Sequence, residues 1–125
     1  MFKKLLILGM LVTSLFSEVR ELTGENFDRA TKRGLVVVEF WATWNEANKV
    51  TILDDWDNFD AKVYRLKICS YPQIQADNEV VILPTIIFYD DGEEVERLQG
   101  DMSFTLKTTT DELDEVVEEI LGNKF

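Results

Sequence analysis

The side chains best suited to chemistry in this chain are one thiol and several carboxylates. Cys69 is the only cysteine among the 125 residues, and there is no histidine. Catalysis by Ser-His-Asp or Cys-His groups is therefore excluded, as are metal sites built on histidine. A single thiol can neither close an intramolecular disulfide nor supply a cysteine-rich zinc site. We expect the chain to bind no metal and no cofactor.

Carboxylates are dense between Asp54 and Asp60, a composition that suggests calcium binding. Phe59, however, stands where a ligand would be needed, and no glycine follows to form the sharp turn of a calcium loop. A solvated loop is therefore the preferred interpretation. The net charge of −11 argues against nucleic acid or an anionic membrane surface as a partner. The excess of acid is then most simply a solubility feature, and the oligomeric state is left open.

The remaining candidates gather around one stretch, LVVVEFWATWNEANK, which begins at Leu35. Its first four residues are β-branched or aliphatic, which is typical of a strand buried on both faces. The acid Glu39 interrupts this run and is followed by Trp41 and Trp44. Asn45 can then cap the first turn of a helix. The pattern predicts a strand, a tight turn with exposed tryptophans and a helix N-terminus.

This stretch resembles the active-site motif of the thioredoxin family, which is an apolar strand, an acid, Phe-Trp-Ala-x-Trp and then Cys-Gly-Pro-Cys-Lys. Asn45 and Asn48 stand where the family has its two cysteines, and Glu46-Ala47 replace Gly-Pro. A second match is Leu83-Pro84-Thr85, where the family has a cis-proline that faces the active site. The resemblance implies an α/β thioredoxin fold, with a central mixed β-sheet flanked by α-helices.

The resemblance also implies that the usual chemistry is lost. A thioredoxin attacks a substrate disulfide with a thiolate at a helix N-terminus, and a second thiol resolves the mixed disulfide. An amide cannot be that nucleophile, so dithiol exchange at Asn45 and Asn48 is excluded. We expect no catalytic residue in this motif.

The resemblance further implies that the chain keeps the family's peptide-binding groove. In thioredoxins an extended peptide pairs with backbone groups on a shallow apolar surface beside the motif, a form of strand addition. We expect non-catalytic polypeptide binding, as an adaptor or holdase, although these residues could instead serve only the architecture of the fold. The groove predicted here is formed by Trp41, Trp44, Glu46, Ala47, Leu83, Pro84 and Thr85.

Two further residues keep alternatives open. Glu39 matches a buried proton-relay acid of the family. Burying a lone carboxylate is costly, so Arg65 on the neighbouring strand is its expected ion-pair partner, and the alternative is that Glu39 acts as a functional proton acceptor. Cys69 would lie at a strand end near the Pro84 loop. It is either an inert buried side chain or the thiol of a single-thiol disulfide oxidoreductase or redox sensor. Lys67 and Arg65 could lower its pKa if they share its face. A third alternative is a purely structural role in an assembly.

The N-terminus has the composition of a targeting segment. Residues 1–17 combine two lysines, an apolar core from Leu5 to Phe16 and Ser17 before a cleavage site. The core is too short to span a bilayer comfortably. We therefore expect a signal peptide, a single thioredoxin-like domain at 18–125, and export to the periplasm or beyond, with no stable membrane anchor after cleavage. Alternatively, the segment stays as an N-terminal helix.

Periodicity elsewhere predicts the elements that hold these residues. Alternating apolar residues favour strands, and apolar spacings of three and four favour helices. Residues 101–110 are expected either to extend the last strand or to fold over it, because Phe104 and Leu106 alternate with polar residues. The predicted helices are one capped by Thr23, one that begins at Asn45 and one that begins at Asp111, and Gln73 to Asn78 is expected to form a short helix or a turn. The predicted strands are Ala61–Cys69, Thr85–Tyr89 and Glu93–Leu98, the last two joined by a turn at Asp91-Gly92.

Overall fold

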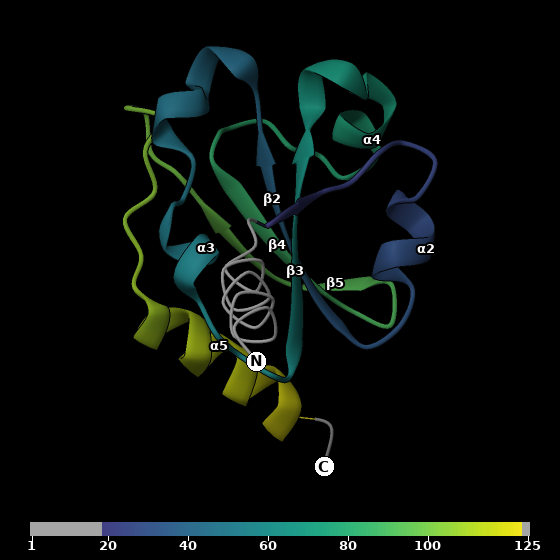
Figure 1. Cartoon of the computed structure of the whole chain (residues 1–125), viewed down its shortest axis with the longest axis vertical. Helices are drawn as coiled ribbons and strands as arrows, with labels where there is room; N and C mark the ends of the chain where they lie inside the picture. The colour runs from purple at the N-terminus through teal and green to yellow at the C-terminus, as the bar shows by residue number, and fades with distance from the viewer. Residues whose placement is uncertain (1–18, 124–125) are drawn as a thin grey trace, which may run out of the picture.

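A five-stranded sheet forms the centre of the computed structural model, which describes residues 19–123 (Figure 1). The predicted signal peptide lies outside the described residues. Within them, no helix is long and apolar enough to cross a bilayer. The strands are β1 (Arg20–Glu21), β2 (Leu35–Trp41), β3 (Ala61–Lys67), β4 (Thr85–Asp90) and β5 (Glu93–Gln99).

The sheet is mixed, as the sequence predicted. Its strand order is β1-β3-β2-β4-β5. β3 runs parallel to β1 and β2, whereas β4 is antiparallel to both β2 and β5. β2 is therefore the central strand, and all seven of its residues are buried.

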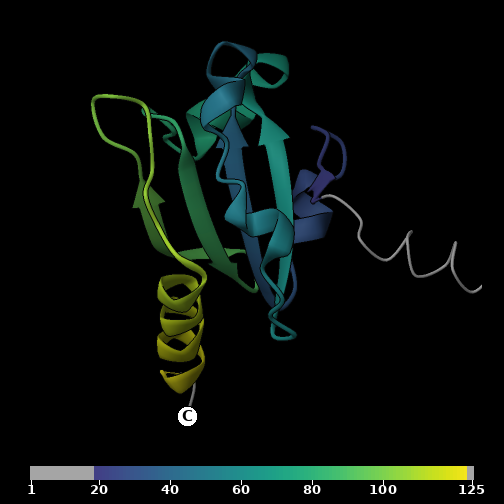
Figure 2. The same ribbon diagram turned by 60° about the vertical axis from the view of Figure 1, so that its left-hand side comes forward.

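Helices cover both faces of the sheet (Figure 1). α2 (Phe27–Thr31) and α4 (Pro72–Asp77) lie on one face, and α3 (Ile52–Asp55) and α5 (Thr110–Gly122) on the other. Figure 2 shows α2 and α5 on opposite sides of the strands. Successive residues of β2 alternate between the two cores: Val36 and Val38 pack with α2, while Leu35 and Val37 pack with α5. Because helices cover both faces of the sheet, β2 is buried on both sides, and this accounts for its run of apolar, β-branched residues.

The segment after β2 differs from the prediction. Instead of one helix capped by Asn45, the chain forms a 3₁₀-helix, η1 (Thr43–Asn48), with a non-helical backbone at Asn45 (φ −121°, ψ 19°). Lys49 is then extended (ψ 146°), and α3 contributes only a single turn. Asn45 is therefore not a helix cap, and the second helix is broken.

The buried pair Glu39 and Arg65 explains this break. The Val50 amide donates to Glu39 Oε2 at 2.7 Å, and the Val50 carbonyl accepts from Arg65 Nη2 at 2.9 Å. A side chain that takes a main-chain group offers the backbone an alternative to the helix ladder. The Val50 amide is therefore not available to the helix, whereas the Val50 carbonyl also accepts from the Leu53 amide at 3.2 Å, where the helix resumes.

Other element ends also shift. β3 ends at Lys67, two residues earlier than predicted, and Cys69 falls in a 3₁₀ turn, η2 (Ile68–Ser70), so the predicted alternation stops before the cysteine. α2 starts at Phe27 rather than directly after Thr23. Thr23 and Asn26 exchange side-chain hydrogen bonds with each other's amides, at 2.7 and 3.3 Å, which is the pattern of a capping box. The Phe27 amide donates to the Thr23 carbonyl at 3.1 Å, so the predicted cap at Thr23 is present, one turn before α2.

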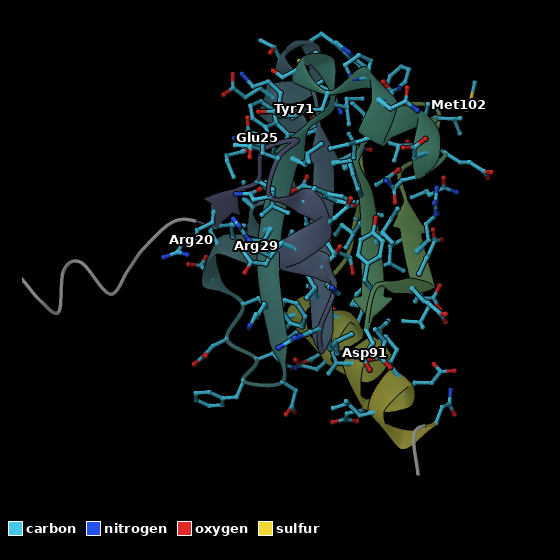
Figure 3. All side chains as sticks on the ribbon, turned by 90° about the vertical axis from the view of Figure 1, so that its right-hand side faces the viewer. Arg20, Glu25, Arg29, Tyr71, Asp91 and Met102 are labelled. Atoms are coloured by element: carbon cyan, nitrogen blue, oxygen red, sulfur yellow. The ribbon has the colours of Figure 1, made fainter. Side chains whose placement is uncertain are left out.

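The predicted hairpin turn at Asp91-Gly92 joins β4 to β5. Both residues have positive φ, 51° and 89°, as a tight hairpin turn requires. Gly34, at φ 71°, donates its amide to Asp91 Oδ1 at 2.7 Å and accepts from the Asp91 amide at 3.0 Å. In Figure 3, Asp91 lies at one end of the molecule, and Tyr71 and Met102 lie at the other.

Candidate functional site

Four connecting segments meet at the end of the sheet opposite Asp91. The carboxyl ends of the parallel strands β2 and β3 share this edge, and they lead into η1 and η2. β4 is antiparallel to β2, so it begins here, directly after the cis peptide bond Leu83–Pro84. β5 ends here and leads into the loop of residues 100–109.

A groove of about 200 Å³ lies between these segments. Its walls are mainly apolar, and two of its side chains are strongly exposed, Trp44 at 65% and Val81 at 86%. Exposed apolar side chains that gather around a hollow are typical of a binding surface. The groove is lined by Trp44, Cys69, Val80, Val81, Leu83 and Phe104, among others.

Phe104 is a groove residue that the sequence analysis did not select. Its ring stands edge-on to Trp44, with ring centroids 5.3 Å apart and an interplanar angle of 89°. The sequence signal was the apolar pair Phe104 and Leu106 in the loop after β5. The loop forms no strand, so it does not extend β5, and Phe104 turns toward Trp44 in η1.

Trp41 does not line the groove, contrary to the prediction. Its side chain is 8% exposed, and its indole nitrogen donates to Glu21 Oε1 at 2.7 Å. The ammonium groups of Lys49 and Lys67 lie 4.4 and 5.4 Å from its ring centroid. Successive strand residues point to opposite faces, and this alternation directs Trp41 toward β1 and the lysines.

Of the other predicted groove residues, some line the groove and some do not. Leu83 lines the groove. Pro84 and Thr85 are buried beside it, and the Thr85 hydroxyl donates to the Ile82 carbonyl at 2.5 Å. Glu46 and Ala47 are exposed on η1 and are not part of the lining. The groove therefore lies closer to α4 and to the loop after β5 than the sequence predicted.

Asn45 and Asn48, at the motif's two key positions, are joined by a hydrogen bond. Asn48 Nδ2 donates to Asn45 Oδ1 at 2.8 Å, and Asn45 Nδ2 donates to the Phe104 carbonyl at 3.2 Å. Asn45 is buried, whereas Asn48 is exposed. The two amides thus connect η1 to the loop after β5, a role that the capping hypothesis missed.

Glu39 and Arg65 lie beneath the site as a buried ion pair. Arg65 Nε is 2.8 Å from Glu39 Oε1, and Arg65 Nη1 is 2.8 Å from Asp54 Oδ1. Burial raises the pKa of the Glu39 carboxyl, while the hydrogen bonds from Arg65 and Val50 oppose that rise. Every polar atom of this group has a partner, which suits a structural role.

Cys69 is exposed and lines the groove. Its sulfur lies 3.6 Å from the Thr43 hydroxyl. The pKa of the thiol is lowered, first by the Thr43 amide and then by the Thr43 hydroxyl, while the charge of Lys67 contributes least. A thiolate is therefore favoured by hydrogen bonding more than by the lysine that the sequence indicated.

The acidic run does not assemble a metal site. Asp54 is bound to Arg65, and Asn58 donates to Asp114 Oδ1 at 2.9 Å. Across residues 19–123, no three acidic or cysteine side chains converge as a metal site would require.

Comparison with known proteins decides the family. The thioredoxin family model matches residues 18–112. The chain belongs to the thioredoxin family. Its relatives include the thioredoxin of Staphylococcus haemolyticus, 33% identical over 86 residues, covering 64% of this chain and 82% of the relative. The thioredoxin of Listeria monocytogenes is 29% identical over 104 residues, covering 79% and 95%.

A solved thioredoxin structure agrees on the fold. A mutant thioredoxin of Halobacterium salinarum superposes with a TM-score of 0.68 at 22% identity, covering 82% of this chain and 89% of that one. This thioredoxin-family domain has a single cysteine, which lies outside the motif, so it has lost the dithiol site.

Proposed function

We propose that this chain binds an extended segment of another polypeptide in the groove, without catalysing dithiol exchange. The observation that carries the proposal is the exposure of Trp44 and Val81 around the groove. Aromatic side chains at the centre of an apolar surface are the usual energetic anchors of protein recognition.

The backbone beside the groove suits strand addition. Among the described residues, the amide and carbonyl of Val81 make no hydrogen bond, and both lie in the segment just before the cis peptide bond. An extended chain that runs past Val81 could pair with these groups while one of its side chains enters the groove.

Charge indicates the composition of the partner. Glu46 is exposed on η1, two residues after Trp44, and the exposed Glu79 lines a second hollow that shares Val80 and Val81 with the groove. With the net charge of −11, these acids favour a partner segment with lysine or arginine next to an apolar residue. The basic, apolar composition of residues 1–17 supports export, so the partner would be a periplasmic or secreted protein.

Substitution of Trp44 tests the proposal. A peptide array with one apolar residue between lysines identifies a ligand, and its affinity is then measured by calorimetry. Trp44→Ala should weaken binding by more than ~1 kcal/mol, about fivefold or more, because it removes an anchor. Phe59→Ala is the matched control, since Phe59 is 98% exposed but lies before β3, at the other end of the sheet. Equal affinities for wild type and Trp44→Ala would contradict the proposal.

A second candidate function rests on the exposure of Cys69 in the same groove. Its thiolate would attack one sulfur of a partner's disulfide, forming a disulfide between Cys69 and the partner. The partner's other sulfur would leave as a thiolate. Non-reducing gels of captured partners, with wild type and Cys69→Ser, separate the two functions. An adduct that disappears with reductant and with Cys69→Ser supports the single-thiol function, and a partner held equally by both proteins supports binding alone.

A further inference from the structure

We propose that Asn45 is a positioning residue that holds Phe104 as the end wall of the groove, and that this wall limits the groove to one apolar side chain. The assignment of that side chain to a polypeptide rests on the proposed function. The wall itself follows from the contacts of the loop after β5.

The amide of Asn45 is suited to this role because it donates and accepts at once. It donates to the Phe104 carbonyl at 3.2 Å and accepts from Asn48 at 2.8 Å. Neither a thiol, which is a weak donor and acceptor, nor a carboxylate, which only accepts, could make both bonds well. Asn45 is 6% exposed, so competition from water is limited.

The loop itself has a fixed turn that directs Phe104 toward the groove. The Phe104 amide donates to the Asp101 carbonyl at 3.0 Å, and the Asp101 amide donates to the Thr105 carbonyl at 3.1 Å. Phe104 has a φ of 60°, a conformation that is uncommon for a bulky residue and is held only where surrounding contacts determine it. The ring contact with Trp44 and the hydrogen bond from Asn45 hold Phe104 in this conformation.

The base of the loop is pressed against the segment before Pro84. A Cβ atom at Gly100 would lie 2.8 Å from the Thr105 carbonyl oxygen and 3.0 Å from that of Leu83. The Gly100 amide also donates to the Pro84 carbonyl at 2.8 Å. The loop is therefore fixed at its base by Gly100 and near its tip by Asn45.

Size then sets what the groove accepts. A volume of about 200 Å³ is below the 300–1,000 Å³ typical of pockets for whole small molecules, which favours a single side chain at the Phe104 end. Beyond Val80 and Val81 the surface continues into the second hollow. Because Phe104 lines the groove, displacing it would lengthen the space. The wall therefore acts on specificity by admitting one side chain and excluding bulkier groups.

Asn45→Asp tests whether the bond to Phe104 holds the wall. The variant keeps an acceptor for Asn48 but loses the donor to the Phe104 carbonyl. We expect amide hydrogen exchange at residues 101–105 to accelerate about three- to tenfold, the range for loss of one hydrogen bond, while exchange in β2 stays unchanged. Glu46→Gln is the control, because Glu46 lies in the same turn and contacts Lys49 at 4.0 Å. Unchanged exchange in the loop would overturn the proposal.

Alkylation of Cys69 tests the effect of the wall on size, without any peptide. Iodoacetamide is the small reagent, and pyrenyl maleimide is the bulky one. In Asn45→Asp and Phe104→Ala, the rate for the bulky reagent relative to the small one should rise about threefold or more. The variant that carries both substitutions should have the same rate ratio as Phe104→Ala alone, because Asn45 acts through Phe104.

These measurements separate the wall from the proposed function. A rate ratio that is the same in all four proteins, or effects that simply add in the double variant, would overturn the proposal. If no peptide binds but exchange and alkylation change as expected, the polypeptide partner is wrong and the wall remains.

Discussion

Arg65 connects three segments of the chain beneath the site. Its guanidinium contacts Glu39 in β2, Asp54 in α3 and the carbonyl of Val50 between them. The planar group donates in several fixed directions, which a lysine could not do. The sequence predicted its pairing with Glu39, but Asp54 and the main chain of Val50 were not foreseen, because neither contact follows from spacing.

Arg65→Leu should destabilise the protein by about 3–5 kcal/mol, because it leaves Glu39 buried without its partner. Urea unfolding followed by far-UV circular dichroism measures the change. Glu46→Gln, which breaks an exposed pair with Lys49, should change the free energy of unfolding by less than about 0.5 kcal/mol. A loss below about 1 kcal/mol for Arg65→Leu would contradict a structural role for the pair.

At the scale of elements, the strands were more predictable than the helices. β2 and β4 follow from apolar runs and β5 from the Asp91-Gly92 turn, and each of the three strands ends one residue later than predicted. The segment from Asn45 to Trp56 has a helical pattern of apolar residues, yet side chains far away in the sequence take the main-chain groups of Val50. A tertiary contact of this kind overrides local propensity and leaves no signal in the local sequence.

The C-terminal helix α5 offers a test at the same scale. Thr109 caps it, since its hydroxyl accepts from the Glu112 amide at 3.2 Å. Thr109→Ala should lower the free energy of unfolding by about 1 kcal/mol, because an N-terminal amide of the helix loses its partner. The neighbouring Thr108 contacts only the Glu112 carboxylate, at 2.9 Å, so Thr108→Ala should cost less than about 0.5 kcal/mol. Equal effects of the two substitutions would argue against the cap.

At the scale of the whole molecule, the two ends of the sheet differ in how their strands are connected. The hairpin turn at Asp91 and its bonds to Gly34 lie at one end, opposite Tyr71 and Met102 (Figure 3). The four connecting segments form the groove at that other end. The family motifs predicted that the groove lies at this end of the sheet, and they predicted two of its residues, Trp44 and Leu83. They could not predict Phe104, because the loop after β5 lies outside both family motifs and its turn toward Trp44 depends on contacts with distant residues.

The whole chain should not accelerate the reduction of insulin by dithiothreitol. Turnover in that reaction needs a thiol that attacks and a second thiol that resolves, and only Cys69 is present. The turbidity of precipitating insulin chains measures the rate, with dithiothreitol alone and with Cys69→Ser protein as controls. A rate above both controls would show that the chain catalyses disulfide reduction.

The broken helix after β2 also bears on the loss of the dithiol site. Cysteines restored at positions 45 and 48 would meet a 3₁₀ turn with α3 beginning only at Ile52, so neither sulfur would face the N-terminus of a long helix. The Phe104 carbonyl would lose its donor as well. On this backbone, two substitutions alone would return the sulfur atoms without the helix N-terminus that lowers the pKa of a reactive thiol.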